Sequence, residues 1–372
     1  MTRLIGVLAV VVLLFFPSVK ADPVDLDAVL AEAMRPTQVP AMGMLVIRDG
    51  AISTVAVRGV RRSDGADPVS AGDIWHIGSD GKAMTATLIA SLVDRGVLSW
   101  DASLAQMLPD LVDRMRPEYR EVTLIQLLSH HAGLPHDVSD TRFIDSFYAD
   151  RRPLPEQRLA YIARALEEPP VAPPGTTFNY SNTGFLIAAA IAEHAAGSAY
   201  EDLMRRDLFQ PLGMTSVGFG RVPAGQPSGH VDGRPISKPD DSNPLIFTAA
   251  GDWHLTLQDW AKFCIDQMEG ANGHGKILRP ETYRTIQTPH PADQPTGLGW
   301  GVQDTIAGRQ GLVLTHAGSD GSWFAIVTLF PRLRSGVLVV ANAGEAMGGE
   351  KAATAAMISV LPSLSPAAAA KN

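Results

Sequence analysis

The amino-acid sequence predicts an α/β (α+β) protein in which one antiparallel sheet takes strands from both ends of the chain and a helical lobe is inserted between them. Residues 43–58 alternate apolar and polar residues at strand spacing, and strand-like runs return between residues 298 and 342. From residue 79 to about 210, apolar residues recur at helical spacing. We therefore expect the two ends to share one sheet, with a site in the cleft between sheet and lobe.

The elements follow in chain order. Asp49-Gly50 predicts a two-residue hairpin turn within 43–58, because both central positions of that turn need positive φ. Residues 216–247, rich in Gly and Pro, predict a long loop that walls the site. Thr256-x-x-Asp259 predicts a capped helix that ends near Met268. Further helices are expected at 79–95, 123–129, 154–167, 181–196 and 199–208, and further strands at 298–303, 311–316, 322–330 and 335–342.

Residues 1–21 have the pattern of an export signal. Arg3 precedes thirteen apolar residues, 4–16, and Val19-Lys20-Ala21 forms a small-x-small cleavage site. About 20 residues are needed to cross a bilayer, so we expect cleavage and no membrane span afterwards. The remaining chain is assigned as an α/β lobe at 22–78 and 255–360, a helical lobe with the wall loop at 79–254, and a disordered tail at 361–372.

Composition narrows the partners and the compartment. The net charge is −8, and loss of Arg3 and Lys20 with the signal would leave about −10, which argues against nucleic acid and anionic lipid as partners. Cys264 is the only cysteine, so no intrachain disulfide can form, and its apolar neighbours indicate a buried structural thiol. Export without disulfides favours a bacterial periplasm.

Ser79 and Lys82 stand three residues apart at the start of the predicted helix 79–95. One helical turn brings such positions to the same side, so the hydroxyl and the amine can meet. A serine becomes a nucleophile when a base takes its proton, and lysine serves as that base only when burial lowers its pKa from about 10.4. This chain has 7 lysines and 24 arginines; arginine cannot be deprotonated, so a lysine here fits a base. A Ser-Asp-Gly turn that caps the helix is the alternative interpretation.

A second triplet, Tyr180-Ser181-Asn182, stands at the start of the predicted helix 181–196. Ser181 or Asn182 could simply cap that helix. In the functional interpretation, Tyr180 exchanges protons with Lys82, and Asn182 binds a substrate carbonyl or orients the lysine.

A third triplet, His316-Ala317-Gly318, is expected to end the strand 311–316 and to open a turn toward the next strand. Gly318 would let a substrate approach the strand edge, and the backbone N–H groups of Ser319 and Ser79 would together hold an oxyanion. A strand-end histidine with only a structural role is the alternative.

In this order and on these elements, the three triplets resemble those of the serine β-lactamase and penicillin-binding-protein superfamily. The chain is most similar to the branch of class C β-lactamases, D-Ala-D-Ala carboxypeptidases, D-aminopeptidases and related esterases. The resemblance covers roughly residues 25–350. Supporting stretches are Val122 to His130 with Gly133-Leu134-Pro135, Pro211-Leu212-Gly213-Met214, and Gly297 to Gly301.

The resemblance implies a β-lactamase/transpeptidase-like fold, with the sheet flanked by helices. It implies that Ser79 is the acylated nucleophile, with Lys82 and Tyr180 as the general base and acid pair. Asn182 would contact the substrate and the lysine, and His316 with Gly318 would form the third motif on an edge strand.

Two positions depart from the family pattern. His316 stands where many β-lactamases have lysine, which weakens a carboxylate clamp and favours peptidase-like or esterase-like relatives. Asp80-Gly81 is unusual inside the first motif, where glycine loosens the helical turn by about 1 kcal/mol relative to alanine.

Competing mechanisms fit less well. A Gly-x-Ser-x-Gly elbow matches neither Ser79 nor Ser319. The histidines at 130, 131 and 136 have no acid or cysteine at metal-site spacing, so no metal is expected. No Glu-x-x-x-Asn occurs, so a separate glutamate base for deacylation has no candidate.

The sequence therefore predicts an exported serine hydrolase that forms an acyl-enzyme at Ser79 and uses no cofactor. Its substrate would be a small molecule or peptide: a β-lactam, a D-amino-acid peptide or a carboxylic ester. The alternative is a binding or sensor-type protein that recognises cell-wall peptides or β-lactams without turnover. Gly81 and the missing lysine of the third motif are the reasons to consider it.

Overall fold

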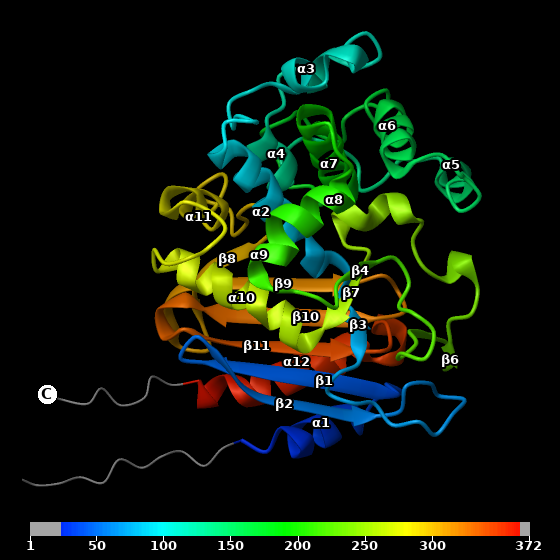
Figure 1. Ribbon diagram of the computed structural model, residues 1–372, viewed down its shortest axis with the longest axis vertical. Helices are drawn as coiled ribbons and strands as arrows, with labels where there is room; N and C mark the ends of the chain where they lie inside the picture. Colours follow the sequence, from blue (N-terminus) through cyan, green and yellow to red (C-terminus); the bar gives the residue numbers. More distant parts are fainter. Residues whose placement is uncertain (1–23, 365–372) are drawn as a thin grey trace, which may run out of the picture.

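The computed structural model describes residues 24–364 and centres on a six-stranded sheet. The strand order is β2-β1-β11-β10-β9-β8, and all neighbouring strands are antiparallel. β1 and β11 lie side by side, which joins the two ends of the chain and confirms the predicted fold class (Figure 1). The strands are β1 (Ala41–Arg48), β2 (Ala51–Gly59), β8 (Gly301–Ile306), β9 (Arg309–Ser319), β10 (Phe324–Phe330) and β11 (Ser335–Ala341).

The hairpin between β1 and β2 turns where the sequence predicted it. Asp49 and Gly50 have φ values of 52° and 74°, as a two-residue turn of this kind requires.

Both faces of the central strands β1, β10 and β11 are buried, and residue alternation decides which layer a side chain joins. In β1, Met42 and Met44 pack in the layer of α1 (Leu26–Met34) and α12 (Gly349–Val360), whereas Leu45 packs in the opposite layer. Sequence analysis predicted neither helix, because their apolar stripes are short and rich in alanine. The two helices pack against each other on this face, because the neighbouring strands β1 and β11 bring the two ends of the chain together.

Helices also cover the other face. α10 (Leu257–Ala271) packs against β1, and the Thr256 hydroxyl accepts the Asp259 N–H at 3.2 Å, as the predicted cap requires. Cys264 in this helix is buried, as predicted. Several of the remaining helices gather at the top in Figure 1. These remaining helices are α2 (Gly81–Asp94), α3 (Leu104–Met107), α4 (Leu124–Leu128), α5 (Thr141–Ser146), α6 (Leu154–Ala165), α7 (Asn182–Ala196), α8 (Tyr200–Met204), α9 (Gln210–Leu212) and α11 (Pro280–Ile286).

The expected wall loop, 216–247, contains three short strands: β4 (Gly218–Phe219), β5 (His230–Val231) and β6 (Arg234–Pro235). β4 pairs with β7 (Trp253–Thr256), and β7 also pairs with β3 (Ile74–His76). This small sheet connects the loop to the segment directly before Ser79.

The strand that carries the third triplet is longer than predicted. β9 does not end at His316 but continues to Ser319, because Gly318 still pairs with Ala325 of β10. His316 therefore lies within a strand and does not open a turn. Pairing with β10 continues beyond His316 and keeps these residues extended.

The first four residues of the predicted disordered tail, 361–364, are ordered. Residues 361–363 form a 3₁₀ helix, and Leu361 and Leu364 are buried in the layer of α1 and α12. The predicted export signal at 1–21 and the tail residues 365–372 lie outside the described residues.

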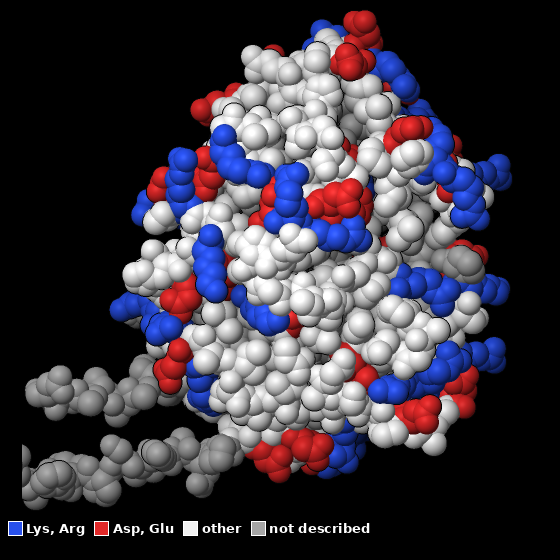
Figure 2. All heavy atoms as spheres, viewed as in Figure 1, with Lys and Arg blue, Asp and Glu red and all other residues white. Residues whose placement is uncertain are grey.

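Acidic and basic side chains lie close together in several places on the face shown in Figure 2. Within residues 24–364, no helix has both the length and the apolar character that a bilayer span needs.

Candidate active site

The candidate nucleophile lies on a short turn between a strand and a helix. β3 ends at His76, a 3₁₀ turn covers Gly78–Asp80, and α2 begins at Gly81. Ser79 on this turn is half-buried, whereas Lys82 in the first turn of α2 is 0% exposed. The structure brings the two together, with Lys82 Nζ 3.0 Å from Ser79 Oγ.

Two carbonyl oxygens hold the lysine amine. Lys82 Nζ donates to Asn182 Oδ1 at 2.7 Å and to the backbone carbonyl of Ala250 at 2.5 Å. Burial lowers the pKa of Lys82 from 10.5 to about 7, although nearby carboxyl groups oppose the shift. A neutral amine has two N–H groups and one lone pair. The two carbonyl oxygens take both N–H groups, which leaves the lone pair for the Ser79 hydroxyl.

Tyr180 lies against the same amine, with its ring centroid 4.8 Å from Lys82 Nζ. Burial raises the pKa of the Tyr180 phenol above its usual value, and a hydrogen bond with Ser79 partly offsets this shift. His130 stacks on the Tyr180 ring at a centroid distance of 4.4 Å, and its Nδ1 accepts the Ser181 N–H at 3.1 Å. The phenol is thus protonated at neutral pH and held in place beside the Ser79–Lys82 pair.

The second triplet both starts a helix and contacts the lysine. Ser181 is the N-cap of α7, because its hydroxyl accepts the Gly184 N–H at 3.2 Å. Asn182 is then free to direct Oδ1 at Lys82, while its Nδ2 donates to Asp137 Oδ2 at 3.4 Å. The helix cap and the contact with Lys82 are thus made by different residues of this triplet.

The third triplet lies against the nucleophile turn. β8 pairs with β9 only as far as Thr315, so residues 316–319 have no β8 partner on that side. A Cβ atom at Gly318 would lie 2.2 Å from the Ile77 carbonyl oxygen and 2.5 Å from the Ser79 backbone nitrogen. Only glycine allows this approach, which sets the backbone of β9 against the Ser79 turn.

The His316 side chain is 10% exposed. Burial and then the charge of Lys82 lower the pKa of His316 to about 3. The imidazole is therefore neutral at pH 7 and lacks the positive charge that a lysine would carry at this position.

Sequence reasoning missed the backbone carbonyl of Ala250. Every residue has a backbone carbonyl, so no side-chain pattern in the sequence predicts this contact. The glycine at position 81 was an indirect signal in the sequence. The structure gives its reason, because a Cβ atom there would lie 3.3 Å from Gly251 Cα and from the Trp253 ring. Glycine in the first motif therefore lets the segment that holds Ala250 pack closely against the start of α2. His130 was also missed as a contact of Tyr180, although its stretch was part of the family resemblance.

A cavity of about 520 Å³ opens beside the cluster. His130, Tyr180 and His316 line it together with mainly apolar residues from β8, β9, β10 and α12. A substrate that reaches this cavity would therefore contact Tyr180 and His316.

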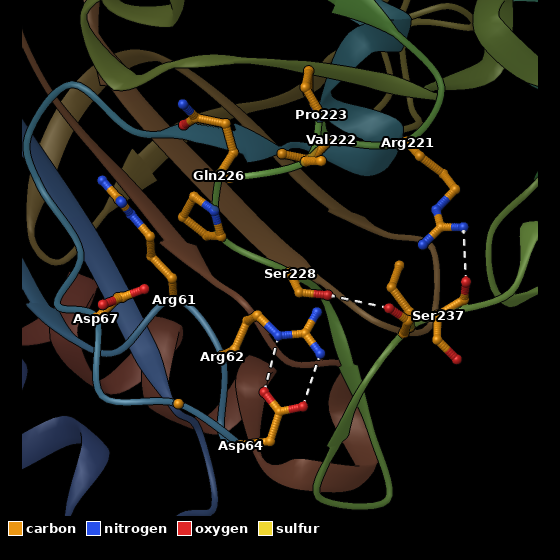
Figure 3. A pocket seen from close by; sticks show the side chains of 15 residues that line it. Arg61, Arg62, Asp64, Asp67, Arg221, Val222, Pro223, Gln226, Ser228 and Ser237 are labelled. Atoms are coloured by element: carbon orange, nitrogen blue, oxygen red, sulfur yellow. Dashed lines mark hydrogen bonds and ion pairs between the residues drawn. The ribbon is translucent and has the colours of Figure 1, made fainter.

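A second cavity, of about 680 Å³, lies between residues 61–67 and the wall loop (Figure 3). None of the predicted catalytic residues lines it. Arg62 is paired with Asp64, and Arg221 donates to the Ser237 carbonyl at 3.4 Å. The wall loop thus borders a cavity, but guanidinium groups there already have acceptors.

Comparison of the chain with known protein families identifies the class to which this fold and this cluster belong. The model of the Beta-lactamase family matches residues 26–361, and the chain belongs to this family. The family resemblance stated from the three triplets is therefore confirmed.

The individual relatives share about a quarter to a third of the aligned residues with this chain. The chain is 31% identical over 177 residues to penicillin-binding protein 4 of Amycolatopsis lactamdurans, a match that covers 47% of this chain and 44% of that protein. It is 24% identical over 352 residues to the unguisins hydrolase ungD' of Aspergillus campestris, which covers 86% of this chain and 62% of the relative. The chain thus spans less than two thirds of the length of these relatives.

Two solved structures share the fold. The octameric penicillin-binding protein homologue from Pyrococcus abyssi has a TM-score of 0.74 and 26% identity, and covers 91% of this chain and 76% of its own. SurE has a TM-score of 0.73 and 25% identity, with the same coverage.

Proposed function

We propose that this protein is a serine hydrolase that cleaves an amide or ester bond through an acyl-enzyme on Ser79. One observation carries the proposal: the buried amine of Lys82 lies 3.0 Å from Ser79 Oγ and has carbonyl acceptors for both of its N–H groups. Membership of the Beta-lactamase family and a relative named as a hydrolase support it.

Acylation begins when Lys82 Nζ takes the proton of the Ser79 hydroxyl. Ser79 Oγ then attacks the substrate carbonyl carbon, and the backbone N–H groups of Ser79 and Ser319 stabilise the negative charge on the carbonyl oxygen. Tyr180 passes a proton to the leaving group, which departs as an amine or alcohol and leaves the acyl group on Ser79.

Deacylation uses the same groups in reverse. A water molecule replaces the leaving group, the Lys82–Tyr180 pair takes its proton, and attack on the ester carbon releases the acid and restores Ser79. The low pKa of Lys82 matters in both steps, because a base with a pKa near the working pH is about half unprotonated yet still basic.

The neutral state of His316 bears on the substrate. A substrate carboxylate at the third motif would find no cation in that side chain. We therefore propose that the part of the substrate beside His316 is uncharged, as in a carboxylic ester or an internal peptide bond. A structure of SurE with D-Leu supports a substrate that contains a D-amino acid, and a second relative is named as a hydrolase.

Covalent labelling tests the nucleophile. A fluorophosphonate or a penicillin should add its mass to the peptide that contains Ser79, and Ser79→Ala should remove this label. Ser359→Ala is the matched control, because Ser359 is exposed on α12 and its hydroxyl only donates to Ala355. A label found on another serine of the wild-type protein would refute the assignment.

Turnover separates the hydrolase from the sensor alternative. Parallel assays with nitrocefin, a short-chain p-nitrophenyl ester and a D-Ala-D-Ala peptide should give many product equivalents per protein on at least one substrate. A single burst on every acylating substrate would instead favour the sensor.

A further inference from the structure

The two places where this chain departs from its family pattern face each other. Asp80 directly follows the nucleophile, and its side chain is 0% exposed. Asp80 Oδ1 lies 3.9 Å from Nδ1 of His316, the residue that replaces the family's lysine. Among the described residues, neither Asp80 oxygen nor His316 Nδ1 has a hydrogen-bond partner, although all three atoms are buried. Buried polar atoms normally pair, so the geometry points to an interaction between these two side chains.

Their protonation states are complementary. Burial raises the pKa of Asp80 well above its usual value, despite the opposing charge of Lys82, and the pKa of His316 is lowered to about 3. Burial thus favours a carboxylic acid with one O–H donor at Asp80 and a neutral imidazole with one acceptor nitrogen at His316.

Other titratable groups near the pair either have other hydrogen-bond partners or are weak donors. Lys82 uses both N–H groups on carbonyl oxygens, and His130 accepts the Ser181 N–H. Tyr180 hydrogen-bonds Ser79, and the thiol of Cys264 on α10 is a weak donor. The Ala317 backbone also interacts with the His316 ring and raises its pKa, whereas Nδ1 of the ring has no partner among the described residues. Asp80 therefore has His316 Nδ1 as its acceptor.

We propose that Asp80 is a positioning residue that donates its O–H to His316 Nδ1 and so fixes the histidine in the tautomer whose Nε2–H is offered to the substrate. The two atoms need to approach by about 1 Å to reach hydrogen-bond distance. This role rests on the proposed function, because it assigns a task inside the Ser79 site.

The tautomer decides what His316 can do. His316 and Tyr180 line the same cavity, so an Nε2–H would reach a substrate carbonyl or leaving-group oxygen as a neutral donor. Without Asp80 the imidazole would exchange between tautomers, and only part of the population would carry the donor. A fixed neutral donor suits an uncharged ester or amide, whereas a lysine suits a carboxylate.

Nuclear magnetic resonance reads the tautomer without any substrate. In protein labelled with ¹⁵N-histidine, the two-bond correlations of His316 should show a protonated Nε2 and an unprotonated Nδ1 from pH 5 to 8. A His316→Gln variant assigns this signal among the 10 histidines of the chain. A wild-type signal with protonated Nδ1, or an imidazolium, would overturn the proposal.

Two substitutions separate donation from simple space filling. Asp80→Asn keeps a donor in nearly the same volume, so it should retain the tautomer and keep kcat/KM within about twofold. Asp80→Leu keeps volume without a donor, so it should give mixed tautomers and lower kcat/KM by about five- to tenfold, the factor that one ordinary hydrogen bond is worth. Equal tautomers and rates in wild type and Asp80→Leu would contradict the role.

Controls keep the outcome clear. Asp266→Asn changes a buried acid of α10 that is bonded to Tyr283, and it should leave the His316 signal unchanged. In a His316→Gln background, Asp80→Leu should cause no further loss of kcat/KM, because the coupled partner is gone. If Asp80→Leu fails to fold, the wild-type and Asp80→Asn spectra still decide the tautomer. Fluorophosphonate labelling of Ser79 is measured in parallel, so that failure of the proposed function and failure of the Asp80 role give different results.

Discussion

The two faces of the central sheet differ in what they bury. On one face, every buried position of α1 and α12 is apolar. On the other, the buried positions of α2 include Lys82, Thr85, Thr87 and Ser91. Strand β1 contributes side chains to both layers, so the contrast lies in the helices of each layer.

The difference separates a layer that stabilises the fold from a layer that carries chemistry. Apolar burial contributes favourably on the first face. On the second, a pKa of about 7 for Lys82 corresponds to a net cost of about 5 kcal/mol for its ammonium form, at about 1.4 kcal/mol per pKa unit. Variants on the two faces should therefore separate activity from stability.

The largest effect is expected from Lys82→Arg. Arginine keeps the positive charge but cannot act as a base, so kcat/KM should fall by about 10²–10⁴, the usual contribution of general-base catalysis. Ester hydrolysis and Ser79 labelling would measure the loss. Lys262→Arg is the matched control, because Lys262 is partly exposed on α10 and pairs with Asp259. Retained activity in Lys82→Arg would mean that the residue acts only through its charge.

A smaller effect, on stability alone, is expected from Leu30→Ala. Leu30 of α1 is fully buried in the apolar layer, so the substitution should lower the free energy of unfolding by about 2–5 kcal/mol. Denaturant unfolding would measure the change, and kcat of the folded protein should stay the same. Leu159→Ala on α6 is the control, because that leucine is 45% exposed. A loss of kcat without loss of stability would show that the two layers are not separate.

The smallest effect is expected from pH. Only unprotonated Lys82 can take the Ser79 proton, so kcat/KM should fall about tenfold per pH unit below about 7 and level off above it. Because the Tyr180 pKa is raised, the plateau should extend above pH 9. The Lys82 pKa is lower in the folded than in the unfolded chain, so its contribution to the unfolding free energy should rise from about pH 7 to about 10.5. A kcat/KM that falls as pH rises through 7 would contradict Lys82 as the base.

Local patterns predicted the local structure. The Asp49-Gly50 turn, the Thr256 cap and the pairing of Ser79 with Lys82 each depend on residues within one turn of chain, and each is present. The end of β9 was predicted wrongly, because pairing with β10 extends the strand beyond the point where its own pattern stops.

Contacts between distant residues needed the folded chain. Lys82 meets the Ala250 carbonyl across 168 residues, and a backbone carbonyl leaves no trace in a sequence. The approach of Asp80 to His316 is of the same kind, because it joins the nucleophile turn to a strand from the other end of the chain.

The sequence by itself determined which reactive groups the protein owns and the order of elements that carry them, because periodicity, turn residues and the i, i+3 spacing act over a few residues. Only the tertiary structure decided how those groups are charged. Burial sets the pKa values of Lys82, Asp80 and His316, and burial depends on which distant segments close over each side chain.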